Sequence, residues 1–172
     1  QLVQHGNIDV LVFDYLAEIT MSLLSRAKAK DPALGYAPDF VTALQPLMKE
    51  LKSRGIKVIA NAGGVNPSAC RAALVAAAQA EGVDLKIAAV LGDDLMPQVE
   101  ALRATGTKEM FAGSSFPPKV MSANAYLGAD ASAVDLGAQN YAGAGWQPVR
   151  VWRGPRLGSD HFPVVADLAW IG

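Results

Sequence analysis

The sequence has a single cysteine, Cys70, so it cannot form an intramolecular disulfide. The paired cysteines of a structural zinc site are also absent. No apolar run approaches the ~18 residues that cross a bilayer, and residues 1–7 lack the basic and then apolar order of a signal peptide. We therefore expect a cytoplasmic protein without a membrane partner.

Charge is scarce as well. Charged residues make up 18% of the 172-residue chain, against about 25% in typical domains, and the formal net charge is -1. A protein that binds nucleic acid through its phosphates needs a basic excess. This composition favours a small-molecule substrate over nucleic acid as the partner. It is also compatible with a homo-oligomer.

Short apolar strands alternate with amphipathic helices over the first hundred residues. Three apolar, β-branched runs are typical of buried strands, namely 8–13, 56–60 and 85–91. Helical spacing of apolar residues recurs in four segments, namely 16–30, 40–51, 67–82 and 95–102. We expect Pro46 to kink the second helix or to start its main segment. The alternation predicts an α/β fold with a mainly parallel sheet and flanking helices in Rossmann-like layers.

The domain organisation follows from changes in composition. Residues 1–129 are expected to form the α/β domain, shortened at its start because Gln4 to Asn7 read as the end of an earlier helix. An Ala/Gly-rich connector follows over 130–145. Two further strands, Pro148–Trp152 and Pro163–Leu168, predict a C-terminal β-hairpin within 146–172.

Polar residues follow each of the three predicted strands. Since ligands bind outside the carboxyl ends of parallel strands, we expect these residues to meet at one edge of the sheet. The catalytic candidates are the acids Asp14, Glu18, Asp93 and Asp94. The ligand-binding candidates here are Asn61, Gly63, Gly64 and Asn66.

Each candidate also has a structural interpretation. Gly63 and Gly64 precede a helix whose N-terminus could hold a phosphate, or they form a tight turn with Asn66 as the cap. Asp93 and Asp94 could bind a hard cation or act as acid and base, or they could cap a helix.

The remaining acids and the cysteine carry the same ambiguity. Asp14 and Glu18 share a helical face if the helix begins promptly, which would allow acid and base roles, or they are solvated first-turn acids. Cys70 lies on an apolar stripe and is expected to be buried.

Five motifs in order carry a resemblance to a known family. They are D-V-L-V-F-D-Y-L-A-E-I-T-M-S (9–22), D-P-A-L-G-Y-A-P-D-F (31–40), N-A-G-G-V-N-P (61–67), G-D-D-L (92–95) and S-A-N-A-Y-L-G-A (122–129). Through them residues 8–129 resemble the N-terminal region of the acyclic terpene utilisation (AtuA-like) family. The resemblance implies a bacterial protein of isoprenoid breakdown that handles a branched acyl-CoA thioester as its substrate, in a hydratase or lyase step. It adds Asn124, in the last motif, to the ligand-binding candidates.

A second resemblance begins near Gly145. The segment W-Q-P-V-R-V-W-R-G-P-R-L-G-S-D-H-F-P-V-V-A-D-L (146–168) is similar to the C-terminal end of the endonuclease/exonuclease/phosphatase family. That resemblance implies a Mg²⁺-dependent phosphodiesterase in which His161 is the base and Asp160 holds metal or phosphate. Ser159, Asp160 and His161 cannot form a serine-protease relay, because successive extended side chains point to opposite faces. A truncated or chimeric, non-catalytic scaffold is the other alternative.

Overall fold

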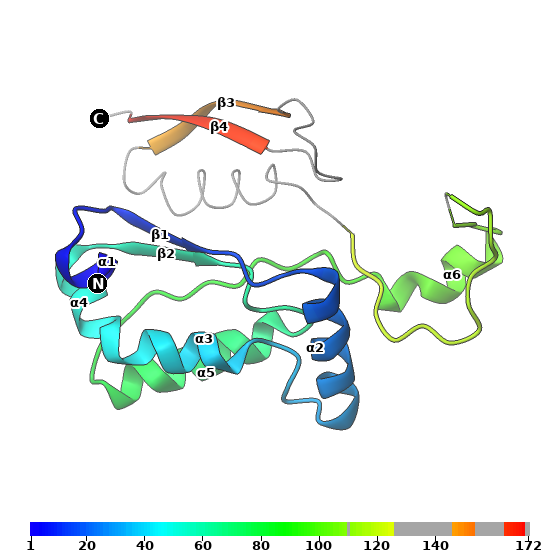
Figure 1. Cartoon of the computed structure of the whole chain (residues 1–172), viewed down its shortest axis with the longest axis horizontal. Coiled ribbons are helices and arrows are strands. Elements are labelled where there is room, and N and C mark those ends of the chain that lie inside the picture. Colours follow the sequence, from blue (N-terminus) through cyan, green and yellow to red (C-terminus); the bar gives the residue numbers. More distant parts are fainter. Residues whose placement is uncertain (110, 126–145, 154–163, 171–172) are drawn as a thin grey trace. The chain divides into compact units, whose positions relative to one another are not determined.

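The computed structural model describes residues 1–109, 111–125, 146–153 and 164–170 (Figure 1). The chain divides into two compact units, Gln1–Ala123 and Asn124–Gly172. The whole of the predicted connector 130–145 and both residues of the Asp160–His161 pair lie outside the described residues.

Helices and strands alternate in the first unit, which confirms the predicted mixture of both. In chain order its elements are α1 (Leu2–His5), β1 (Val10–Phe13), α2 (Glu18–Lys30), α3 (Pro38–Leu44), the 3₁₀ turn η1 (Gln45–Leu47), α4 (Met48–Arg54), β2 (Lys57–Ala60), α5 (Pro67–Ala80), the 3₁₀ turn η2 (Met96–Gln98) and α6 (Val99–Ala104).

Strands β1 and β2 form a parallel pair with α3 and α5 against one face (Figure 1). The register runs from Val10 opposite Lys57 to Phe13 opposite Ala60. Side chains alternate between the faces of a strand. The inner-face residues, which pack against the core, are Leu11, Phe13, Val58 and Ala60. The outer-face residues are Val10, Val12, Lys57 and Ile59.

The predicted third strand, 85–91, is wrong, because this segment joins no strand ladder. It is extended, its exposure alternates from residue to residue, and Leu85 and Ile87 pack toward the core. The carbonyl of Ile87 instead accepts a hydrogen bond from Arg71 Nε at 2.8 Å. Within the described residues the parallel sheet therefore has two strands, and the predicted Rossmann-like layering stays a prediction.

The core lies between the sheet and the helices. Met48 is completely buried, and Phe40, Leu44 and Leu51 surround it from α3 and α4. Pro46 occupies the 3₁₀ turn between these helices, which confirms the predicted interruption and follows from its missing N–H group.

Helix α2 buries less of its apolar surface than its spacing predicts. Ile19 is 76% exposed and Leu23 is 58% exposed, while their neighbour Leu24 is half-buried. Ser25 is buried in their place and donates to the carbonyl of Met21 at 2.7 Å. Ile19 and Leu23 therefore lie outside the core of the described residues.

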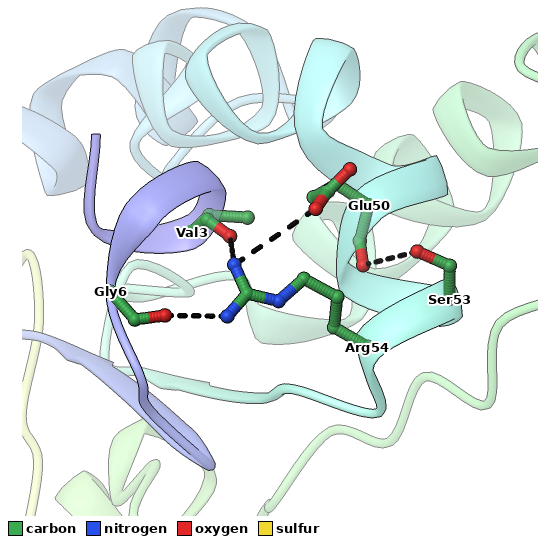
Figure 2. Close-up of polar contacts among 5 residues, drawn as sticks. All are labelled: Val3, Gly6, Glu50, Ser53 and Arg54. Carbon is green, nitrogen blue, oxygen red and sulfur yellow. Dashed lines mark hydrogen bonds and ion pairs between the residues drawn. The ribbon is translucent and has the colours of Figure 1, made fainter.

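A single arginine fastens the N-terminal helix to α4 (Figure 2). The guanidinium group of Arg54 donates to the main-chain carbonyls of Val3 and Gly6. Glu50, one turn earlier on α4, lies 3.9 Å from the same guanidinium group. Because Gly6 ends α1, the predicted helix stop before the first strand is confirmed.

The second unit contains an antiparallel pair, β3 (Trp146–Arg153) and β4 (Val164–Trp170). The register shifts between Pro148 and Arg150, as is usual where a proline cannot donate to a ladder. Residues 154–163, which would form the turn of the predicted hairpin, lie outside the described residues.

Candidate functional site

A hydrogen-bonded pair of side chains joins the carboxyl ends of the two parallel strands. Asp14 and Asn61 follow Phe13 and Ala60, the last pair of the register. Asn61 Nδ2 donates to Asp14 Oδ1 at 2.7 Å. Asn61 Oδ1 accepts from the main-chain N–H of Tyr15 at 2.7 Å. Both ends of the Asn61 carboxamide are thus fixed, which sets the orientation of the neighbouring carboxylate.

The Asp14 carboxylate is exposed and uses only one of its oxygens. Besides Asn61, the main-chain N–H of Leu16 approaches Oδ1, at 3.4 Å. Among the described residues, nothing donates to Oδ2. An ionised carboxylate accepts hydrogen bonds through both oxygens. Oδ2 can therefore accept a proton or a hydrogen bond from a ligand.

Aromatic rings lie directly behind this pair on the core side. Tyr15 packs edge-on against Phe40, with ring centres 5.6 Å apart, and Phe13 does the same at 5.3 Å. Burial raises the pKa of the Tyr15 hydroxyl, and the nearby Asp39 raises it further. Tyr15 was not among the sequence candidates, although alternation beyond Phe13 places it on the inner face.

The glycine loop between β2 and α5 uses its own N–H groups. Gly64 donates to the carbonyl of Asn61 at 3.2 Å, and Asn66 donates to the carbonyl of Gly63 at 2.9 Å. The N–H of Val65 donates to the carbonyl of Gly35 at 2.9 Å. These three donors are engaged within the protein, which is the geometry expected of a tight turn.

Both glycines are needed for close packing. A Cβ atom on Gly63 would lie 2.8 Å from Pro67 Cβ. Gly64 has a φ of 52°, and a Cβ there would meet the Leu24 side chain and would lie 2.7 Å from the Gly35 carbonyl oxygen. The positive φ and this approach together require glycine at position 64.

Asn66 joins three parts of the chain. Its Oδ1 accepts from the N–H of Ala69 at 3.4 Å, which makes it the N-cap of α5. Its Nδ2 donates to the carbonyls of Pro32 at 2.9 Å and Leu34 at 2.7 Å. Lys28, another residue absent from the sequence candidates, donates from Nζ to the carbonyl of Val65 at 2.6 Å. Asn66 and Lys28 therefore hold the glycine loop against residues 31–35 and α2.

The structure separates Asp14 from the helical face of Glu18. Helix α2 begins at Glu18 with Ala17 as the N-cap, so Asp14 lies in the extended segment before the helix. The helix therefore begins later than the shared helical face of Asp14 and Glu18 would require.

The other acidic candidates lie after the extended segment 85–91. Asp94 Oδ1 accepts from the N–H of Met96 at 2.9 Å, a local bond at the start of η2 that resembles the capping alternative. Asp93 precedes it and is half-buried. The N–H of Leu95 donates to the carbonyl of Ala123 at 2.8 Å. Asn124 is the first residue of the second unit.

Two shallow hollows of the first unit are lined by residues other than Asp14 and Asn61. A shallow hollow of about 320 Å³ lies at the C-terminal end of α5, beside Val83 and Leu85. Another, of about 220 Å³, lies beside Lys108 and Phe116. Over the described part of the chain, no group of three or more His, Cys, Asp or Glu residues could hold a metal ion.

Cys70 is buried within α5, and burial raises the pKa of its thiol, so the expectation of a buried residue is confirmed. Among the described residues, no helix has the length and apolar character that a membrane span requires.

Comparison with known proteins identifies the family. The family model described as acyclic terpene utilisation family protein AtuA matches residues 1–139, which include the predicted range 8–129. The match ends before residues 145–172, whose resemblance to the endonuclease/exonuclease/phosphatase family is not shown. Searches of curated proteins and of solved structures find no match. The chain therefore belongs to the acyclic terpene utilisation family AtuA.

Proposed function

We propose that the protein takes part in the breakdown of acyclic isoprenoids by binding a branched acyl-CoA thioester at the carboxyl edge of β1 and β2. The family match supports the class of pathway. The proposed position of the binding site is supported by the Asp14–Asn61 hydrogen bond, which holds an exposed carboxylate at the ends of both parallel strands. Ligands of parallel α/β sheets bind at this edge.

The proposed reaction is a hydration or its reverse, a lyase step. In a hydration, Asp14 Oδ2 accepts a proton from water as the water oxygen bonds to the β carbon of an α,β-unsaturated thioester. The α carbon of the resulting enolate then takes this proton from Asp14, so one water is added overall and the carboxylate is restored. Asn61 Nδ2 carries two N–H groups and gives one to Asp14. The second can donate to the thioester carbonyl, where negative charge develops.

The glycine loop would shape the edge of this site. Because Gly63, Gly64 and Asn66 hold the loop that begins at Asn61, they keep the carboxamide in place. Asp93, Asp94 and Glu18 remain proposed contributors to ligand binding.

Ligand-dependent thermal stabilisation tests the binding step. A ligand at about 100 times its Kd stabilises a protein by about 2.7 kcal/mol. Geranyl-CoA is expected to raise the Tm more than CoA alone, and Asp14→Asn and Asn61→Ala are expected to reduce that shift. Asp84→Asn is the matched control, because Asp84 is an exposed acid beside the hollow at the C-terminal end of α5. If no acyl-CoA shifts the Tm, the proposed ligand is wrong.

Product analysis separates an enzyme from a non-catalytic scaffold. Incubation with geranyl-CoA followed by mass spectrometry is expected to show a gain of one water in the product with the unaltered chain and none with Asp14→Asn. Binding without conversion in both proteins would contradict the hydratase or lyase step and favour the scaffold.

A further inference from the structure

One side of helix α2 carries an exposed stripe of two apolar and two basic residues. Ile19 is 76% exposed and Leu23 is 58% exposed, and Arg26 and Lys30 are exposed as well. Successive residues of an α-helix are about 100° apart, so these four positions fall within about 60° of the helix circumference. Neither apolar residue belongs to the core cluster. The stripe is apolar in its first half and positive in its second half.

The opposite side of α2 is held against the glycine loop of the candidate site. A Cβ atom on Gly64 would meet the Leu24 side chain, so the helix and the loop are closely packed. One turn later, Lys28 donates from Nζ to the carbonyl of Val65 at 2.6 Å. The helix follows the end of β1 and runs away from the sheet (Figure 1). The stripe therefore starts near Asp14 and leads away from it.

The basic half of the stripe is available to an anion. Among the described residues, the side chains of Arg26 and Lys30 form no hydrogen bond or ion pair. The nearest acid in the sequence, Asp31, accepts through Oδ1 from the main-chain N–H of Ala33 at 2.9 Å. Arginine and lysine bind phosphate through charge-assisted hydrogen bonds. A phosphate group is therefore the anion that these two side chains suit.

We propose that the stripe binds the CoA part of the thioester, an inference that rests on the proposed function. The order of groups along the stripe matches their order along an acyl-CoA molecule. The thioester lies at Asp14. The methylene and dimethyl groups of the pantetheine arm pack against Ile19 and Leu23. The pyrophosphate and the 3′-phosphate bind Arg26 and Lys30.

The length of CoA agrees with the length of the stripe. The pantetheine arm has about twelve atoms between its sulfur and the pyrophosphate, as many as the backbone of about four residues, and spans about 14 Å when extended. From the first residue of α2, the helix rises about 12 Å to Arg26 and about 18 Å to Lys30. Since the 3′-phosphate lies beyond the pyrophosphate, CoA is long enough to reach the basic end from the start of the helix.

Calorimetric titration with two thioesters separates the phosphates from the rest of the ligand. Geranyl-CoA carries the phosphates, and the geranyl thioester of pantetheine lacks them. Arg26→Glu and Lys30→Glu should each raise the Kd of geranyl-CoA by about tenfold or more and leave the Kd of the pantetheine thioester unchanged. Lys52→Glu is the matched control, because Lys52 is also an exposed lysine in the last turn of a helix. It should leave both Kd values unchanged.

A further substitution tests the position of the pantetheine arm. Both thioesters contain this arm, so Leu23→Asp should raise the Kd of both by about tenfold. Ala72→Asp adds the same charge at an exposed position of α5 and should leave both values unchanged. If Leu23→Asp affects neither thioester, the proposed position of the arm is wrong.

The two titrations distinguish failure of this inference from failure of the proposed function. If geranyl-CoA binds and both charge reversals leave its Kd unchanged, the inference is wrong and the proposed function stands. Equal losses for the two thioesters in Arg26→Glu and Lys30→Glu would also overturn it, because the phosphates would then not be the groups held. If neither thioester binds the unaltered chain, the proposed function is wrong and the inference falls with it.

Discussion

Arg54 and Gly6 are 48 residues apart in the sequence, yet the guanidinium group of Arg54 donates to the main-chain carbonyl of Gly6 (Figure 2). The same group reaches the carbonyl of Val3, whose side chain is buried in the core. One side chain thereby holds the short α1 helix and the entrance to β1 against α4. A helix of four residues is not stable by itself, so this attachment and the burial of Val3 in the core support it.

Arg54→Ala should release α1. The loss of two charge-assisted hydrogen bonds is expected to cost about 2 kcal/mol of unfolding free energy. Hydrogen exchange at residues 2–8 should rise more than exchange elsewhere. Glu50→Gln removes only a partly exposed pair at 3.9 Å and should cost a few tenths of a kcal/mol. Unchanged exchange at residues 2–8 in Arg54→Ala would contradict the attachment.

Gly64→Ala should destabilise the protein by about 2 to 4 kcal/mol. About 1 kcal/mol comes from the positive φ, and the rest comes from forcing a methyl group against Leu24 and the Gly35 carbonyl. Gly82→Ala is the control, since Gly82 has a φ of 67° but no atom within 4 Å of an added Cβ. Urea denaturation of both variants measures the steric part as their difference. Equal losses would show that the contact is easily relieved.

Asn66 can be dissected with two substitutions. Asn66→Ala loses the helix cap and both bonds to the carbonyls of Pro32 and Leu34, and is expected to cost about 2 kcal/mol or more. Asn66→Asp keeps the cap acceptor but places a carboxylate against those two carbonyls, so it should also destabilise. Denaturation midpoints of the two variants measure these losses. An Asn66→Asp variant as stable as the unaltered chain would show that Asn66 stabilises the fold only as the helix cap.

Cys70 should make stability fall in alkaline solution. Burial raises the pKa of the thiol in the folded state above its ordinary value of 9.0. The folded state then holds a proton that the unfolded state has lost, so the unfolding free energy decreases as the pH rises above about 9. Cys70→Ala should remove this part of the slope. The decrease in unfolding free energy due to Tyr15, whose pKa is also raised above its ordinary value of 10.0, should remain in this variant at higher pH. Identical pH profiles of the two proteins would contradict a buried thiol.

Local signals in the sequence predicted local structure well. Gly6 as a helix stop, Pro46 as an interruption and Asn66 as an N-cap act within a few residues of the chain, and the structure contains all three. The apolar runs 8–13 and 56–60 contain the two strands that pair with each other in parallel.

The wrong predictions concern tertiary contacts, which the local sequence does not determine. Segment 85–91 has the composition of a strand, but it pairs with no strand among the described residues, and the Ile87 carbonyl accepts from the Arg71 side chain. Ile19 and Leu23 have helical spacing and yet lie on the exposed side of α2. Convergence of the strand ends could be predicted for Asp14 and Asn61. The sequence could not predict which of their atoms form hydrogen bonds, or that the main-chain N–H of Tyr15 donates to Asn61.

The contacts around Gly35 join residues 31–37 and 61–67 into one structural unit. The N–H of Val65 donates to Gly35, and the N–H of Ala37 donates to Ala62 at 2.8 Å, so each loop completes the backbone bonding of the other. A designer who grafts N-A-G-G-V-N-P onto another α/β protein would have to carry D-P-A-L-G-Y-A with it. Neither heptapeptide alone encodes the shape that the two adopt together.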